Sequence, residues 1–200
     1  KNTLLQTLYH LAGRRLASGK DYEQAERERL AKLMQEARER LPLKIPGEEL
    51  EAHFEHLTPR YFRTHSLEHI NIDLTQVNRF LKRVVNGTGS KVLEPIIAWH
   101  NRPARGHTSV KICTWDRPGL FTTISGALAA AGLNILSARV FSRSDGIIID
   151  TFLVVNASTG GLAKRPERDT FKKLLTQALL PDESPEFQTQ IDALAERGTP

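Results

Sequence analysis

Apolar residues in the first 90 positions recur every three or four residues, as on one face of an amphipathic helix. One stripe of leucines runs over residues 4–16, and a second stripe covers 21–41, where proline and glycine residues then interrupt it. A short helix is expected over 48–56, and a longer one after Ser66, which suits an N-cap position. The first part of the chain is therefore predicted to be helical throughout.

From residue 92 the pattern changes to short apolar runs separated by turn-forming residues, which is typical of β-strands. The run over 147–155 is apolar on both faces except at Asp150 and Thr151, which suggests a central strand. The predicted elements are, in order, a strand over 92–99, a turn over 101–106, a strand over 108–114, a helix over 120–131, strands over 133–143 and 147–155, and a helix from Pro166 or Glu167 to Leu180. This order predicts a ferredoxin-like α+β fold, in which helices pack on one face of an antiparallel sheet.

Composition narrows the class of protein. With 40% hydrophobic and 26% charged residues, the chain is typical of a soluble globular protein, and no apolar run reaches the ~20 residues that span a bilayer. Basic and acidic residues are interleaved, so the net charge of +5 indicates solvated helix faces and not a nucleic-acid surface. The single cysteine, Cys113, lies in an apolar strand pattern and is expected to be a packing residue in a reducing cytoplasm. The chain does not begin with Met, and we expect a fragment.

The turn Asp116-Arg117-Pro118-Gly119 ends one predicted strand and opens a helix. A proline suits the first helical position, where its missing N–H costs nothing, and the free backbone N–H groups of Gly119, Leu120 and Phe121 would carry the positive end of the helix dipole. Such an end attracts a carboxylate or a phosphate, while Asp116 can accept a hydrogen bond from an amino group. The turn therefore suits an amino acid, which has both charges. A plain turn with a capping aspartate explains the same residues equally well.

Other candidate chemistry is weaker. His65 and His69 stand four apart, but Ser66 takes the place of the glutamate of a zinc-protease motif, so we predict no metal site. No Walker A sequence and no catalytic Ser/His/Asp set is recognisable, so we predict no catalytic residues in this chain. Four arginines are candidates for a basic edge that meets an acidic ligand or a neighbouring domain, although a solvated face explains them more simply: Arg102, Arg105, Arg139 and Arg143.

Two stretches of this sequence resemble ACT domains, which bind amino acids and similar effectors: Trp115 to Phe121, and Gly132-Leu133-Asn134-Ile135 after the helix. Three further stretches resemble one family within that group, the PII-protein uridylyltransferase/uridylyl-removing enzymes. They are 138–146 together with 150–154, the helical lead-in Pro59 to Ser66, and the strand and loop over 92–106. The resemblance covers roughly residues 48–180.

The resemblance implies three parts: a helical segment over 1–90 that ends a hydrolase (HD) region and forms a linker, an ACT domain over 91–182, and a polar tail over 183–200 toward a missing second ACT domain. It also implies a cytoplasmic parent enzyme, a nucleotidyltransferase plus hydrolase that uses Mg²⁺. That parent adds UMP to a PII signalling protein when glutamine is scarce and removes it when glutamine is plentiful. The fragment itself should be catalytically silent and need no cofactor.

By the same resemblance the effector is glutamine, and a second ACT domain or a homodimer partner would complete its site. The expected ligand-binding residues are Asp116, Arg117, Gly119, Leu120 and Phe121, with Asn134 and Ile135 at the start of the next strand. An alternative is an interaction or dimerisation module that binds no effector.

The sequence departs from the usual βαββαβ order of ACT domains because no convincing last strand follows Leu180. The strand over 92–99 precedes the usual first strand and can pair antiparallel with it. We predict that it fills the sheet edge that the last strand normally occupies.

Overall fold

A computed structural model describes residues 11–12, 19–40 and 45–180 of the chain. Contacts divide the chain into two compact units, Lys1–Ile72 and Asp73–Pro200. The helix predicted over 4–16 and the polar tail over 183–200 lie outside the described residues, apart from residues 11 and 12. The domain boundaries near residues 90 and 182 stay a prediction.

The first unit is helical, as the periodicity predicts. It contains α2 (Gly19–Glu39), α3 (Gly47–His56), α4 (Pro59–Thr64) and the beginning of α5 (Leu67–Asn86). Its core is aromatic as well as aliphatic, because Tyr61 and Phe62 on α4 are almost fully buried and Phe54 stacks on Phe62 with ring centroids 4.4 Å apart. The sequence pattern missed α4, a helix of only six residues that begins at a proline.

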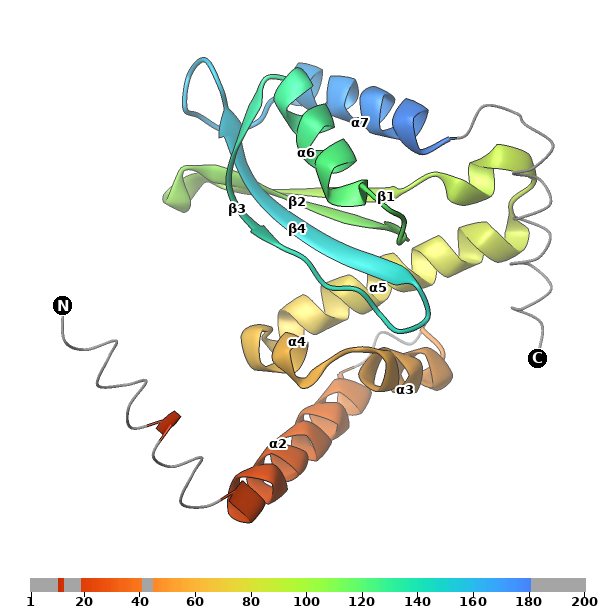
Figure 1. Ribbon diagram of the computed structural model, residues 1–200, viewed down its shortest axis with the longest axis vertical. Helices are drawn as coiled ribbons and strands as arrows, with labels where there is room; N and C mark the ends of the chain where they lie inside the picture. The colour runs from red at the N-terminus through yellow and green to blue at the C-terminus, as the bar shows by residue number, and fades with distance from the viewer. Residues whose placement is uncertain (1–10, 13–18, 41–44, 181–200) are drawn as a thin grey trace. The chain divides into compact units, whose positions relative to one another are not determined.

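The second unit contains a four-stranded antiparallel sheet in the order β1-β2-β4-β3 (Figure 1). The strands are β1 (Ile96–Arg102), β2 (His107–Trp115), β3 (Leu133–Arg139) and β4 (Ile147–Asn156). The predicted α+β fold is confirmed, and β4 is a central strand as its apolar run suggested. The predicted edge strand is also confirmed, since β1 pairs with β2 and with no other strand of the described sheet.

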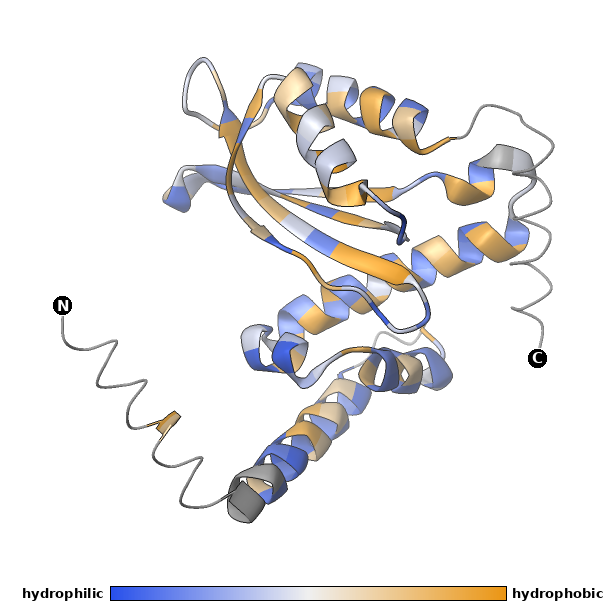
Figure 2. Cartoon of the chain, viewed as in Figure 1, coloured by the Kyte–Doolittle hydropathy of each residue, from blue (hydrophilic) through white to orange (hydrophobic). Residues whose placement is uncertain are grey.

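Two helices, α6 (Leu120–Ala130) and α7 (Arg165–Leu179), lie side by side over one face of this sheet (Figure 1). Alternating apolar residues of β2 and β4 form the core beneath them, including Val110, Ile112 and Phe152, and Phe171 of α7 is buried there too. In Figure 2 the hydrophobic colour runs along most of β4 and is broken by one polar stretch. The core thus forms between the inward-facing apolar residues of the sheet and the apolar faces of α6 and α7.

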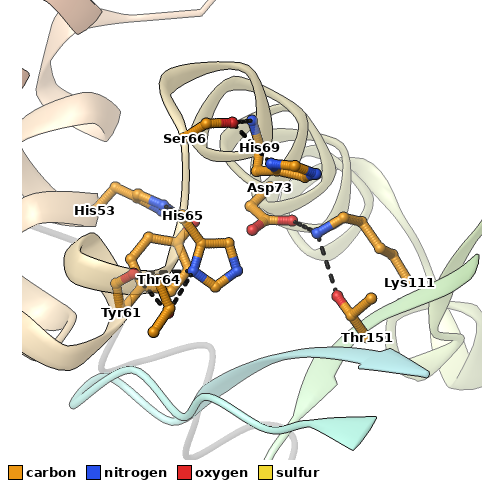
Figure 3. Close-up of polar contacts among 9 residues, drawn as sticks. All are labelled: His53, Tyr61, Thr64, His65, Ser66, His69, Asp73, Lys111 and Thr151. Carbon is orange, nitrogen blue, oxygen red and sulfur yellow. Dashed lines mark hydrogen bonds and ion pairs between the residues drawn. The ribbon is translucent and has the colours of Figure 1, made fainter. Parts of the chain in front are cut away.

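The opposite face of the sheet is covered by the part of α5 that belongs to the second unit. Lys111 of β2 forms a buried ion pair with Asp73 of α5 and also donates to the Thr151 hydroxyl at 3.2 Å (Figure 3). Phe80 of α5 meets the ring of Trp115 edge-on, with centroids 5.3 Å apart. Cys113 lies on this face and is 1% exposed, so its prediction as a packing residue is confirmed.

Three predicted strand limits are wrong. The first strand ends at Arg102 and not at Trp99, so it includes the first two residues of the predicted turn over 101–106. The first strand begins at Ile96 and not at Val92, because Gly89–Leu93 forms a 3₁₀ turn and Pro95 has no backbone N–H for a sheet. The regular third strand ends at Arg139 and not at Arg143, although Ser142 still forms an antiparallel bridge with Ile148 of β4. Between these two points the Phe141 N–H donates to the Asp150 carboxylate at 3.3 Å.

Candidate functional site

The turn between β2 and α6 opens into a small cavity of about 220 Å³. Five of the seven predicted ligand-binding residues line it: Asp116, Arg117, Gly119, Leu120 and Phe121. Four residues that the prediction did not include complete the lining: Val140, Ser142, Ile148 and Asp150. The cavity is smaller than the roughly 300–1,000 Å³ of pockets for drug-sized ligands, so it suits a small molecule.

The other two predicted residues, Asn134 and Ile135, do not line this cavity. They pair with Val155 and Val154 near the far end of β4, whereas Asp150 lies four residues before Val154. At about 3.3 Å per residue, this separation is roughly 13 Å along the strand. Residues from the two parts of the ACT-like pattern are therefore separated within one copy of the domain.

The cavity floor is the first turn of α6. Gly119 is the N-cap residue with φ of 74°, a left-handed conformation that favours glycine, and no side chain shields the helix end there. The Leu120 N–H donates to the Arg117 carbonyl at 3.2 Å, so our expectation that this N–H is free is wrong. Among the described residues, no backbone acceptor takes the N–H groups of Gly119 and Phe121, which suit an anionic group.

Asp116 and Arg117 diverge on either side of the turn. The Asp116 carboxylate is exposed and accepts a hydrogen bond from the Ser142 hydroxyl at 3.0 Å, which ties β2 to the segment after β3. Arg117 donates to the Leu179 carbonyl at 2.8 Å, at the negative end of α7. Partial burial lowers the pKa of Arg117. Its main observed contact is thus with α7, although it also lines the cavity.

Asp150 is the residue that sequence reasoning missed. Its side chain lies on the same face of β4 as the core residues Ile148 and Phe152, it is 2% exposed, and it lines the cavity. Burial raises the pKa of Asp150 from 3.8 to about 7, the hydrogen bond from the Phe141 N–H lowers it, and the nearby Asp116 charge raises it. The signal was present in the sequence as a carboxylate inside an apolar run, but no spacing rule links it to residue 116.

This arrangement can bind a small zwitterion. Two carboxylates, Asp116 and Asp150, line the cavity and suit an ammonium group, while the α6 N–H groups suit a carboxylate. A buried carboxyl that titrates near neutral pH in a cavity is a common mark of a functional group. In the parts of the chain that the structure describes, no group of three or more His, Cys, Asp or Glu residues is placed to hold a metal ion.

Three histidines described in the first unit, His53, His65 and His69, make local contacts (Figure 3). His65 is 9% exposed, its ring stacks on Tyr61 with centroids 4.2 Å apart, and its Nδ1 lies 2.9 Å from the Tyr61 carbonyl oxygen. His53 Nε2 lies 3.2 Å from the Tyr61 hydroxyl. The Nδ1 atom of His69 lies 2.8 Å from the Ser66 hydroxyl, next to the start of α5. These contacts give each ring a structural role.

The four arginines considered as a basic edge do not form one. Arg102 is on β1, whereas Arg139 is on β3, and these strands are the opposite edges of the sheet. Arg143 is buried and forms an ion pair with Asp145 at 2.6 Å, which shapes the hairpin before β4. Sequence spacing alone could not separate these positions, because the edge that a strand occupies depends on topology. None of the helices described is long and apolar enough to cross a membrane.

Comparison with known proteins gives two results. Residues 108–165 match the sequence profile of a family described as ACT domain. Three relatives carry the name bifunctional uridylyltransferase/uridylyl-removing enzyme. The one from Zymomonas mobilis is 41% identical over 80 residues, 40% of this chain and 8% of that enzyme. The one from Vibrio cholerae is 29% identical over 157 residues, 78% of this chain and 17% of that enzyme. The one from Pasteurella multocida is 24% identical over 192 residues, 94% of this chain and 21% of that enzyme. The chain therefore spans about a fifth or less of the length of these curated relatives.

Proposed function

Because residues 108–165 are an ACT domain and most of the chain is related to bifunctional uridylyltransferase/uridylyl-removing enzymes, we propose that it is a glutamine-sensing regulatory module of such an enzyme. In the parent, a Mg²⁺-dependent nucleotidyltransferase would add UMP to a PII signalling protein and a hydrolase would remove it. This chain would report the glutamine level to those activities, in the cytoplasm. The names of the relatives support a parent enzyme that both transfers and removes uridylyl groups.

The observation that carries the proposal is the buried carboxyl of Asp150 in the same cavity as Asp116 and the α6 N-terminus. Ionising a buried carboxyl without a cation is unfavourable, and the α-ammonium group of an amino acid would relieve this cost. The ligand carboxylate would then accept from the N–H groups of Gly119 and Phe121. Glutamine also has an uncharged side-chain amide, which could extend past the apolar rim formed by Phe121 and Val140.

The site would be shared between two copies or between two ACT domains. Asn134 and Ile135, which the resemblance includes in the site, are exposed on β3 and away from the cavity of their own domain. A partner would bring its own β3 residues to the open side of this cavity. In this arrangement the two groups of expected ligand-binding residues, which are separated within one domain, would meet in one site between two domains.

The test is calorimetry of the 200-residue chain with L-glutamine, L-glutamate and N-acetyl-L-glutamine, which lacks the α-ammonium group. We expect glutamine alone to bind well, and Asp150→Asn to weaken binding by about 10- to 100-fold, because a hydrogen bond to a charged group contributes about 1.5–3 kcal/mol. Asp169→Asn, which removes an exposed carboxylate of α7, is the matched control. Glutamine binding that is unchanged by Asp150→Asn and by the Asp116→Ala, Gly119→Val double variant would refute the site, provided that melting curves show folded proteins.

A second candidate function, an interaction module that binds no effector, is favoured by a different observation. Four apolar residues beside the cavity and along β3 are 37–59% exposed: Phe121, Ile135, Leu136 and Val140. Phe121 and Val140 line the same cavity, and exposed apolar residues that lie together are typical of protein contact surfaces. Light scattering decides between the two functions: a glutamine-independent dimer with no calorimetric signal supports the interaction module.

A further inference from the structure

The sheet edge formed by β1 lies in a groove of about 1120 Å³ that no part of the proposed function uses. Its walls carry seven basic side chains and two carboxylates, Glu94 and Asp169. The basic side chains come from segments far apart in the sequence. The sequence alone therefore did not predict that they form one cluster. The groove therefore concentrates positive charge, although the sequence alone indicated that these residues lie on solvated helix faces.

Two helical stripes supply six of these seven cations. Arg79, Lys82 and Arg83 recur at helical spacing on α5, and Arg165, Arg168 and Lys172 do so on α7. Because α7 covers one face of the sheet and α5 the other, the two stripes flank the β1 edge from both sides. Among the described residues, no carboxylate is paired with Arg79, Lys82 or Lys172.

The outer edge of β1 is regular and unpaired in the described part of the chain. Its seven residues keep an unbroken antiparallel register with β2, and their backbone groups make no other backbone hydrogen bond there. At the opposite edge, β3 has a register shift between Ile135 and Ser137, an irregularity that discourages pairing. β1 has no such irregularity and no proline, so it can accept a further strand.

We propose that this groove binds an extended, acidic segment of polypeptide, which adds to the β1 edge as a fifth strand. About seven residues, some 23 Å when extended, would cover β1. Successive side chains of a strand point to opposite faces, so neighbouring acidic residues would reach the α5 stripe and the α7 stripe in turn. Main-chain bonds would give affinity, and the two stripes would select for negative charge.

A single-stranded nucleic acid fits the groove less well. Such ligands need aromatic rings on which bases stack, and the groove offers only Trp99. That ring is already covered, since Arg168 lies 5.3 Å from its centroid and Phe171 meets it edge-on at 5.5 Å. An unpaired strand edge, in contrast, offers regularly spaced backbone N–H and C=O groups, which pair with the backbone of another polypeptide.

The experiment measures fluorescence anisotropy of a fluorescein-labelled peptide, Val-Glu-Glu-Val-Glu-Glu-Val, with the 200-residue chain at low and high salt. We expect binding that weakens with salt. The double variant Arg79→Gln, Lys172→Gln should weaken binding roughly tenfold, since it removes one exposed cation from each stripe. The control Arg139→Gln, Lys173→Gln removes the same charge from exposed positions outside the groove and should change binding less than about twofold.

A second pair of probes tests strand addition separately from charge. The same peptide with alternate amides N-methylated keeps its charge but cannot form one ladder of hydrogen bonds, so it should bind at least tenfold more weakly. Hydrogen exchange of residues 96–102 should slow when the unmodified peptide binds. Equal affinity of the N-methylated peptide, no binding up to about 1 mM, or tighter binding of an eight-nucleotide oligouridylate that depends on Arg79 and Lys172 would each overturn the proposal.

Discussion

Replacing Asp150 with asparagine should make the second unit more stable above neutral pH. Because the pKa of Asp150 is raised from 3.8 to about 7 on folding, the folded state holds a proton that the unfolded state has lost between these values. The resulting stability is fully present below pH 3.8 and is lost as pH rises through about 7. About three pH units at about 1.4 kcal/mol each give a loss of roughly 4 kcal/mol, with little further change above pH 8.

Asparagine keeps an oxygen that can accept the Phe141 N–H but does not ionise. At pH 8 Asp150→Asn should therefore raise the free energy of unfolding by about 2–4 kcal/mol, and at pH 4 it should change it by less than about 1 kcal/mol. Urea unfolding followed by tryptophan fluorescence suits the test, because Trp99 and Trp115 are the two tryptophans of the chain and both lie in the second unit. Asp169→Asn on the surface of α7 serves as the control. An equal effect of Asp150→Asn at pH 4 and pH 8, or a loss of stability at pH 8, would refute the reasoning, because the benefit of asparagine must come from the ionisation that it removes.

Three more outcomes follow from the same structure. Gly126 lies in the middle of α6 with open space where a Cβ would be, so Gly126→Ala should stabilise the domain by about 0.5–1 kcal/mol in urea unfolding. Gly132 has φ of +77°, so Gly132→Ala should destabilise the domain by about 1 kcal/mol. A change of the same sign for both variants would contradict this prediction. Lys111→Met removes the cation beside buried Asp73 and should lower the free energy of unfolding by about 3 kcal/mol, and adding Asp73→Leu should restore most of it. A double variant as unstable as Lys111→Met would argue against a stabilising ion pair. Burial raises the pKa of the Cys113 thiol, so a disulfide reagent should label it only at the rate of unfolding in dilute urea, and immediate labelling of native protein would disagree with its burial.

The sequence was sufficient for elements whose signals are local. Helical spacing predicted α3 and α5, and Asp145-Gly146 predicted the hairpin before β4, where Gly146 has φ of 87°. The edge position of β1 was also predictable, since an ACT-like order without a last strand leaves one edge for it. These features depend on neighbours in the chain or on a known topology.

Features that depend on contacts between distant residues were not predictable. Asp150 joins Asp116 in one cavity because β4 pairs with β2, and Ser142 after β3 pairs with Ile148 of β4. The basic groove gathers Arg79 and Lys172, 93 positions apart by their numbers, around one strand edge. Hydrophobic periodicity carries no information about which polar residues on different elements meet.

On the proposed function, a partner would complete the cavity at the α6 N-terminus. Phe121 and Val140 line it and are 49% and 45% exposed, so apolar surface surrounds a site that would hold a charged ligand. A second ACT domain or a second copy seated there would bury this rim and remove water from Asp150, which would strengthen its attraction to an ammonium group. On the proposed function, glutamine binding and association are then linked, and each must strengthen the other by the same factor.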